Sequence, residues 1–254
     1  MTHPVTAIVL AAGAGKRMQS DLPKPLHQLQ GRPMIDWVID ALGDSRISAG
    51  AVVVGHGGEQ LQSHVERLTN NSLDWNFVEQ HEQLGTGHAA SLALASLPLG
   101  DDDLVLILPG DTPLLRASSI TTLLDHHLAT PAVLSVLSAV VASPTGYGRM
   151  VHDSYGNLAG IVEERDATPE QREIHEINTG IMVGTASALR SALERVGRSN
   201  AQGEFYLTDV IGILVARGMV VRAESLGDPR EAQGVNDPEQ LASCAAALAE
   251  RGLE

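Results

Sequence analysis

The stretch Val5-Thr-Ala-Ile-Val-Leu-Ala-Ala-Gly-Ala-Gly-Lys-Arg-Met18 decides how this chain folds. Its first six residues are almost wholly apolar, which is typical of a strand covered on both faces of a parallel sheet. Gly13 and Gly15 follow directly, and small residues let backbone N–H groups approach a phosphate. The stretch therefore predicts a central strand that runs into an anion-binding loop.

Two common phosphate loops do not fit this stretch. Met18 stands where the dinucleotide fingerprint needs a third glycine, and the second predicted strand lacks the acidic residue that should end it. An NAD-dependent oxidoreductase is therefore disfavoured. The P-loop needs four residues between its glycines and a serine or threonine after its lysine, but here one residue separates the glycines and arginine follows Lys16.

Apolar, β-rich runs alternate with helical patterns along the rest of the chain, and this alternation predicts a doubly wound α/β sheet. Residues 140–165 are more typical of hairpins, so we expect a smaller lobe in the second half. The predicted fold is α/β and Rossmann-like, with a mostly parallel mixed sheet flanked by helices. Strands are predicted at 5–10, 51–54, 75–78, 104–108, 132–141, 158–162, 181–183 and 220–223. Helices are predicted from 33 and at 58–68, 85–97, 117–127, 186–196, 206–217 and 238–248.

Composition and charge narrow the classes of protein. The 254 residues are 43% hydrophobic and include one cysteine, which excludes an internal disulfide and a zinc site built from several cysteines. No basic stretch precedes an apolar one at the start, and no apolar run is long enough to span a bilayer, so we expect a cytoplasmic protein. A net charge of −14 opposes binding to nucleic acid or anionic membranes through the general surface.

The basic residues are unevenly distributed. Residues 1–32 contain four basic side chains against Asp21 alone, and both lysines of the chain, Lys16 and Lys24, lie there. Lys24 stands between two prolines that restrict the backbone on both sides, which would hold a cation close to the glycine loop. A solvent-exposed lysine in a proline-rich turn is the alternative interpretation.

Several further motifs follow this loop in a fixed order. Together they resemble sugar-phosphate nucleotidyltransferases, and in particular the uridyltransferase half of the bacterial bifunctional enzymes that make UDP-N-acetylglucosamine. The similarity covers about residues 5–245. The motifs that carry it are 10–18, 22–24, 80–88, 110–114, 144–149, 161–163, 176–180, 202–209 and 234–236.

The resemblance implies a nucleotide site around the first strand. Arg17 and Lys24 would be catalytic, with Lys24 on the α-phosphate. Gln80 has both a donor and an acceptor, which suits an imide edge such as that of uracil. The remaining residues that the resemblance places at the nucleotide are Leu10, Ala11, Ala12, Gly13, Gly15, Gly85 and Thr86.

A carboxylate follows the buried run at 104–108. Asp111 would lie at the cleft, because ligands bind beyond the carboxyl ends of strands in such sheets. A turn residue is the alternative interpretation of Asp-Thr-Pro. The resemblance makes Asp111 and Asn236 the protein ligands of Mg²⁺, an ion that prefers oxygen. It also implies sugar contacts from Gly110, Gly148, Glu163, Asn178 and Thr179.

Some features depart from the family pattern. Pro109 stands where an aromatic residue is frequent, Phe205 stands where tyrosine is common, and Lys16 replaces a small or hydroxyl residue. The hexapeptide-repeat β-helix of the bifunctional relatives is missing, so we expect neither acetyltransferase activity nor its trimer, and a monomer or weak oligomer instead. We expect one domain, with a nucleotide part at 1–110, a sugar-phosphate part at 111–236 and a C-terminal helix at 237–254.

Two alternatives remain. A sister nucleotidyltransferase would use another sugar phosphate or base, and pyrophosphate release across a panel of substrates would identify it. A non-catalytic sensor would bind the product without turnover, and a magnesium-dependent turnover assay would identify it. The histidines lack zinc-ligand spacing, and His126 and His127 are predicted to lie on the surface.

Overall fold

The computed structural model describes residues 4–13, 15–43, 46–55, 57–68 and 73–252. Its centre is a nine-stranded mixed sheet in the order β11-β7-β10-β6-β1-β4-β5, with β8 and β9 attached beside β10. A two-stranded hairpin lies apart from it. The main strands are β1 (Val5–Ala11), β4 (Ile47–Val54), β5 (Asp74–Glu79), β6 (Leu104–Pro109), β7 (Leu134–Val140), β8 (Arg149–His152), β9 (Leu158–Val162), β10 (Glu176–Thr185) and β11 (Val221–Ser225). The hairpin joins β2 (Gln28–Leu29) to β3 (Arg32–Pro33).

Strand direction decides which chain segments meet at the cleft. Strands β5, β4, β1 and β6 are parallel, so their carboxyl ends share one edge. Strand β10 is antiparallel to both β6 and β7. Its amino-terminal half therefore lies at that same edge, beside the segment that follows β6.

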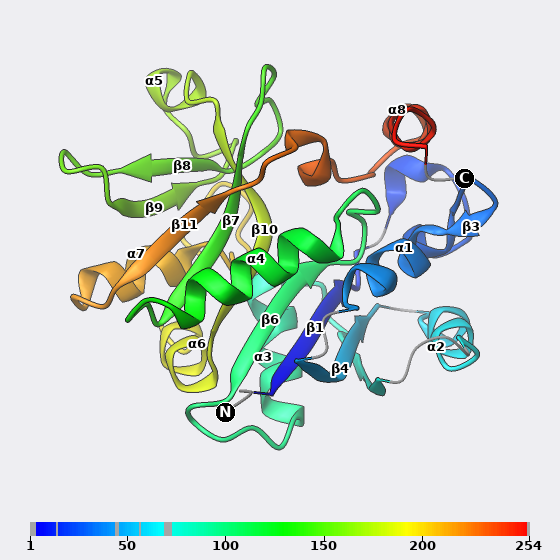
Figure 1. The fold of residues 1–254 in the computed structure, drawn as a ribbon, viewed down its shortest axis with the longest axis horizontal. Coiled ribbons are helices and arrows are strands. Elements are labelled where there is room, and N and C mark those ends of the chain that lie inside the picture. Colours follow the sequence, from blue (N-terminus) through cyan, green and yellow to red (C-terminus); the bar gives the residue numbers. More distant parts are fainter. Residues whose placement is uncertain (1–3, 14, 44–45, 56, 69–72, 253–254) are drawn as a thin grey trace.

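Helices cover both faces of the sheet, as predicted (Figure 1). Helices α1, α2 and α4 pack on one face, and α3, α6 and α7 pack on the other. The bounds are α1 (Met34–Ala41), α2 (Glu59–Val65), α3 (Thr86–Ser96), α4 (Ala117–Leu128), α5 (Pro169–Arg172), α6 (Ala186–Leu193), α7 (Asp209–Ala216) and α8 (Pro238–Glu250). Short 3₁₀ turns are η1 (Lys16–Met18), η2 (Lys24–Leu26) and η3 (Pro229–Ala232).

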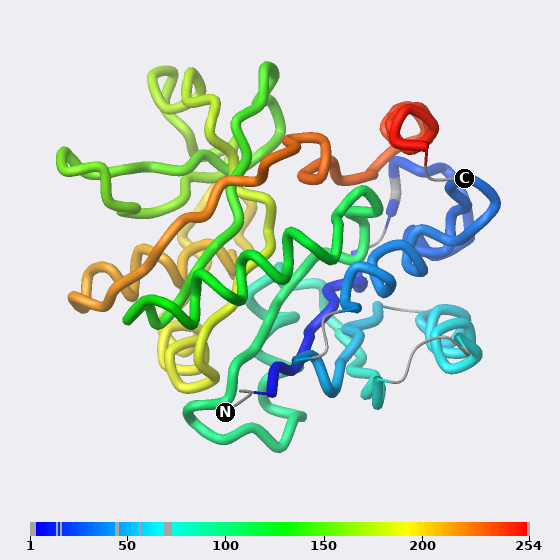
Figure 2. Tube along the Cα trace, viewed as in Figure 1, coloured from blue at the N-terminus to red at the C-terminus, as the bar shows by residue number. Residues whose placement is uncertain are grey.

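The last helix packs on the start of the chain (Figure 2). Cys244, Ala247 and Leu248 of α8 share a small apolar cluster with Met18 and Met34. Burial raises the pKa of the Cys244 thiol to about 12. Arg251, just beyond α8, donates to the carboxylate of Asp228 and to the backbone of the segment before α4. The helix thus connects the two ends of the chain.

Three sequence-based predictions are wrong. The strand predicted at 51–54 begins at Ile47, because Ser48 and Gly50 interrupt its apolar run. The strand predicted at 181–183 spans Glu176–Thr185. The prediction was too short because the first half of the strand alternates polar and buried residues and has no apolar run. His127 is buried rather than exposed and hydrogen-bonds Ser135 at 2.9 Å, and burial lowers its pKa. His126 is exposed, as predicted, and pairs with Glu224. Among the described helices, none combines the length and the apolar character that a membrane span requires.

Candidate functional site

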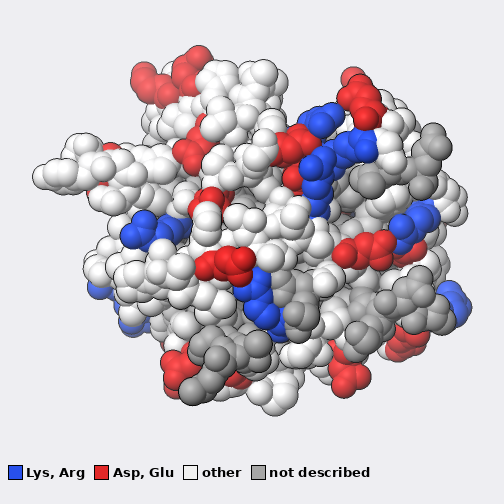
Figure 3. Space-filling view, in the orientation of Figure 1, with Lys and Arg blue, Asp and Glu red and all other residues white. Residues whose placement is uncertain are grey.

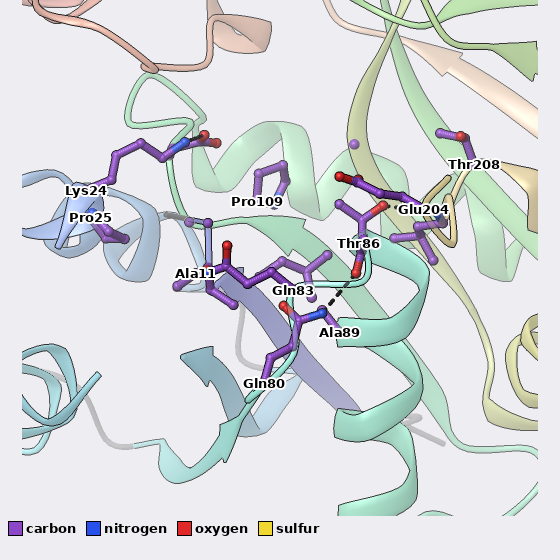
Figure 4. A pocket seen from close by; sticks show the side chains of 18 of the residues that line it. Ala11, Lys24, Pro25, Gln80, Gln83, Thr86, Ala89, Pro109, Glu204 and Thr208 are labelled. Carbon is purple, nitrogen blue, oxygen red and sulfur yellow. Dashed lines mark hydrogen bonds and ion pairs between the residues drawn. The ribbon is translucent and has the colours of Figure 1, made fainter. Parts of the chain in front are cut away.

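A cavity of about 450 Å³ opens at the carboxyl ends of β1 and β6. Lys24 reaches into it from one side, and Glu204 lies on the other (Figure 4). Backbone and side chains from both halves of the chain share its walls. The lining residues are Leu10, Ala11, Ala12, Gly13, Lys24, Pro25, Gln80, Gln83, Gly85, Thr86, Ala89, Pro109, Gly110, Asp111, Glu163, Asn178, Gly180, Met182, Glu204, Leu207 and Thr208.

The glycine loop turns back toward Lys24 directly after β1. Gly15 has φ 57°, a left-handed conformation that favours glycine. A Cβ at this position would lie 3.0 Å from the Cβ of Lys24. The loop and the lysine are therefore in close contact, as the clustered basic residues suggested. Ala14 lies outside the described residues.

Lys24 joins the two residues expected to hold a metal ion. Its Nζ donates to Asp111 Oδ2 and, at 3.0 Å, to the amide oxygen of Asn236. The side chains of Lys24 and Asp111 are only 12% and 19% exposed. The ion pair is therefore partly shielded from water, where attraction between charges is stronger than at an open surface.

Asn236 reaches this position through backbone pairing. Val235 N donates to the carbonyl of Asp111 at 2.9 Å, which brings the 235–236 segment beside the end of β6. Asn236 N donates to Gln240 Oε1 at 2.7 Å, and Asp237 caps α8 by accepting from Gln240 N. The start of α8 thus holds Asn236 in place.

Gln80 closes the opposite end of the cavity. Its backbone N–H extends the sheet by donating to Val54 O at 2.8 Å. Its side-chain Nε2 lies 3.0 Å from the carbonyl of Gly85 and 3.1 Å from His88 Nδ1. The amide nitrogen therefore already has partners within the protein. Only the amide oxygen is available to a ligand, whereas the sequence suggested both groups.

Gln83 was not expected at the site. Its Nε2 donates to the carbonyl of Ala12 at 2.8 Å and so connects the loop after β5 to the glycine loop. It was missed individually, although it lies in the quoted motif at 80–88. It braces the backbone that lines the cavity at Ala11–Gly13.

The second half of the chain contributes a carboxylate. Thr208 Oγ1 donates to Glu163 Oε1 at 2.8 Å. Burial raises the pKa of Glu163, and the Thr208 hydrogen bond opposes this effect. A Cβ at Gly148 would lie 3.4 Å from the same carboxylate, so Gly148 contacts Glu163 without lining the cavity. Thr208 and Glu204 were missed individually, although both lie in the quoted motif at 202–209.

Strand β10 supplies Asn178 to the cavity wall, and Gly180 packs against Pro109. Thr179 points elsewhere, since its hydroxyl donates to Leu137 O and accepts from Ile181 N. Its side chain therefore offers nothing to a sugar in the cavity. Alternation along the strand explains this difference, because neighbouring residues face opposite sides.

Arg17 does not line the cavity. It lies in η1, which begins directly after Gly15, and its side chain is exposed. Gly15 and Asn236 also lie outside the lining set and contact it through Lys24. The structure thus gathers most of the predicted site residues in the cavity wall. Those outside it are Gly15, Arg17, Gly148, Thr179 and Asn236.

The face of the molecule seen in Figure 1 carries both signs of charge. Figure 3 shows acidic and basic side chains lying next to one another on this face. Asp228, for example, pairs with Arg116, Arg230 and Arg251. These hydrogen bonds and charges hold the pKa of Asp228 far below its usual range. Among the described residues that line the cavity, Lys24 is the one basic side chain, beside the carboxylates of Asp111, Glu163 and Glu204.

Comparisons with known proteins show the family that the sequence matches. The family model of the MobA-like NTP transferase domain matches residues 7–177. The bifunctional protein GlmU of Heliobacterium modesticaldum is 44% identical over 249 residues, which cover 98% of this chain and 53% of that protein. The protein of the same name from Xanthomonas euvesicatoria pv. vesicatoria is 45% identical over 242 residues, 95% of this chain and 51% of its own length. That of Stenotrophomonas maltophilia is 43% identical over 253 residues, 100% of this chain and 53% of its own length.

The sheet is Rossmann-like, a glycine loop follows its first strand, and a lysine faces a carboxylate at the end of another strand. These features place the protein in the class of the nucleotidyltransferases. The family match spans more than half of the chain, from residue 7 to residue 177. The chain therefore belongs to the family of MobA-like NTP transferase domains. It spans about half the length of the curated relatives it matches.

Proposed function

We propose that this chain transfers the uridylyl group of UTP to N-acetylglucosamine 1-phosphate, giving UDP-N-acetylglucosamine and pyrophosphate. The observation that carries the proposal is the contact of Lys24 with both Asp111 and Asn236 at the mouth of the glycine loop. This arrangement puts one cation and two oxygen ligands where a triphosphate would meet the first strand. The relatives named above support the choice of reaction.

The reaction is an in-line displacement at phosphorus. An oxygen of the sugar 1-phosphate forms a bond to the α-phosphorus of UTP, and the bond from that phosphorus to the bridging oxygen of the β-phosphate breaks. The attacking oxygen is already anionic, so no side chain has to remove a proton. The main difficulty is bringing two polyanions together, and catalysis then depends on positioning and charge neutralisation.

The donor set fits a divalent ion. Asp111 offers a carboxylate and Asn236 an amide oxygen, and both already share one cation, the ammonium of Lys24. Among the described residues no cluster of three or more His, Cys, Asp or Glu side chains competes for a metal. Mg²⁺ is our proposed ion, because it takes oxygen ligands and keeps places for phosphate and water. When bound, it would neutralise phosphate charge.

The side chains divide the remaining work. A triphosphate in the cavity offers new anionic partners to Lys24, whose donation to the α-phosphate would release the oxygens of Asp111 and Asn236. Arg17, exposed beside the glycine loop, would reach the outer phosphates. Backbone N–H groups of Ala11, Ala12 and Gly13 would serve the nucleotide.

At the other end of the cavity, Glu163 and Asn178 would contact the hydroxyl and acetamido groups of the sugar. In this proposal residues 1–110 serve the nucleotide and residues 111–236 serve the sugar phosphate. The reaction would take place in the cytoplasm, and the protein would be a monomer or weak oligomer. Pro109 and Phe205 favour a second candidate, a sister enzyme that uses another sugar phosphate, because both depart from the pattern of the uridyltransferases.

Pyrophosphate release across a panel of triphosphates and sugar 1-phosphates tests the proposal. We expect the highest kcat/KM with UTP and N-acetylglucosamine 1-phosphate, and no release without a divalent ion. A higher value with another sugar phosphate would favour the sister enzyme. Product binding without any turnover would identify a sensor instead.

A further inference from the structure

At the base end of the cavity, the side-chain amide of Gln80 has hydrogen-bond partners within the protein at its nitrogen. Gln80 is only 4% exposed, and its Nε2 lies between Gly85 O and His88 Nδ1 at 3.0 and 3.1 Å. In Figure 4 the oxygen of the Gln80 amide lies on the side away from the dashed bond. None of the described residues donates a hydrogen bond to that oxygen.

The carbonyl of Gly85 fixes which amide atom faces it. A carbonyl oxygen only accepts, so the group 3.0 Å away is the NH₂ of Gln80. Gly85 has φ 112° and ψ 174°, a combination that is essentially restricted to glycine. A side chain there would lie 2.5 Å from Phe205 O. The backbone of the loop is therefore held in the conformation that aims this carbonyl at Gln80.

The second hydrogen of the same NH₂ requires another acceptor. His88, near the start of α3, offers Nδ1 at 3.1 Å, and the same atom lies 3.1 Å from Glu82 O. Nδ1 can serve only one of these two partners. A neutral ring with its proton on Nε2 accepts from the Gln80 amide at Nδ1 and makes no hydrogen bond to Glu82 O. A proton on Nδ1 would instead donate to Glu82 and set an N–H against the amide N–H. The ring tautomer and the amide orientation are thus coupled.

We propose that His88 is a positioning residue for base selection, which holds the Gln80 amide so that Oε1 faces the base. An acceptor at this point favours a base with a hydrogen on its ring nitrogen, as on N3 of uracil, over cytosine, whose N3 is itself an acceptor. This inference rests on the proposed use of UTP. It adds a residue that, together with the Gly85 carbonyl, keeps the Gln80 amide in the discriminating orientation.

The test compares kcat/KM for UTP and CTP in the wild type, His88→Phe and His88→Asn. Phenylalanine keeps a flat ring, including its contact with Phe205, but has no acceptor. We expect the preference for UTP to fall about tenfold in His88→Phe, the size of one hydrogen bond to a buried group. The loss should be in KM, with kcat nearly unchanged, because the base is remote from the reacting phosphorus. His88→Asn keeps an acceptor near the position of Nδ1 and should retain most of the preference.

His81→Phe is the matched control, because this histidine lies in the loop before α3, is 79% exposed and pairs with Glu79 rather than with Gln80. It should leave the preference unchanged. An unchanged preference in His88→Phe would overturn the inference, as would an equal loss with both nucleotides or no recovery in His88→Asn. If the wild type turns over neither nucleotide, the proposed function fails by itself. Calorimetric binding of uridine and cytidine nucleotides to the same variants then still tests His88.

Discussion

The two ends of the cavity are assembled in different ways. At the base end, Gln80, Gly85 and His88 lie within one short segment, from the end of β5 to the first turn of α3, and contact each other through neutral hydrogen bonds. At the phosphate end, Lys24 contacts residues 87 and 212 positions away through charged or polar groups. The base end is therefore a product of local chain geometry, whereas the phosphate end exists only when the sheet and α8 have come together.

This difference predicts different responses to mutation. A change at the base end should alter one loop and the affinity for nucleotide. A change at the phosphate end should alter charge balance, and its effect on turnover should be greater because charge develops there during the reaction. We therefore expect that the two ends can be perturbed separately.

The largest effect is expected at Lys24. Lys24→Met keeps most of the side-chain volume but removes the cation, and turnover should fall about 10³-fold while the fold is retained. Steady-state pyrophosphate release and a thermal melt measure the two properties. Arg32→Met is the control, since Arg32 lies in the same basic segment but pairs with Asp40 on the surface. Wild-type turnover in Lys24→Met would contradict the proposed mechanism.

An intermediate effect is expected at the base end, in Gly85→Ala. The unfavourable φ and the overlap with Phe205 O should together cost about 3 kcal/mol of stability, and KM for UTP should rise. Gly156→Ala is matched, because Gly156 also has a positive φ but no atom lies within 4 Å of the added methyl group. Gly156→Ala should lower the free energy of unfolding, measured with urea, by only about 1 kcal/mol. Equal costs in the two variants would mean that the loop can move aside.

The smallest effect is expected at Glu163, between the two halves of the chain. Burial raises its native pKa, so above that pKa the folded state contains an ionised carboxylate at a cost in stability. Below the ordinary pKa of an unfolded glutamate both states are protonated and the cost disappears. Glu163→Gln, which keeps the acceptor for Thr208, should therefore raise the free energy of unfolding at pH 8, and this gain should shrink as the pH falls.

Urea unfolding of Glu163→Gln at pH 8 and pH 5 measures this difference. Glu173→Gln serves as the comparison, because Glu173 is exposed. The stability of that variant should follow the wild type at both pH values. If the gain in unfolding free energy of Glu163→Gln instead grew as the pH fell, the pKa of Glu163 would be lowered rather than raised in the folded state.

The sequence predicted those parts of the fold that have a periodic or local signal. The apolar runs at β1 and β6 marked buried strands, and Asp111 followed from its place after β6. Strand β10 was underestimated because its first residues alternate between polar and apolar positions. His127 had a signal that was not used, since it continues the stripe of Ile120, Leu123 and Leu124 on α4.

The site was less accessible to sequence reasoning than the fold. The prolines around Lys24 indicated a held cation, but no local pattern connects it to Asn236, which came from resemblance alone. Gln83 and Thr208 act through single hydrogen bonds to Ala12 and Glu163, and such contacts have no periodicity in the sequence. Tertiary structure is needed to find residues of this kind.

The central claim is that Lys24, Asp111 and Asn236 form one site in which the ammonium and a divalent ion share the same two oxygens. The most direct test is to measure Mn²⁺ binding in the absence of nucleotide, using the EPR signal of the free ion. We expect Lys24→Met to bind Mn²⁺ about tenfold more tightly than the wild type, because both oxygens are released. Arg17→Met, which removes a charge from the same segment without releasing either oxygen, should change the affinity much less. Equal or weaker Mn²⁺ binding in Lys24→Met would contradict the account.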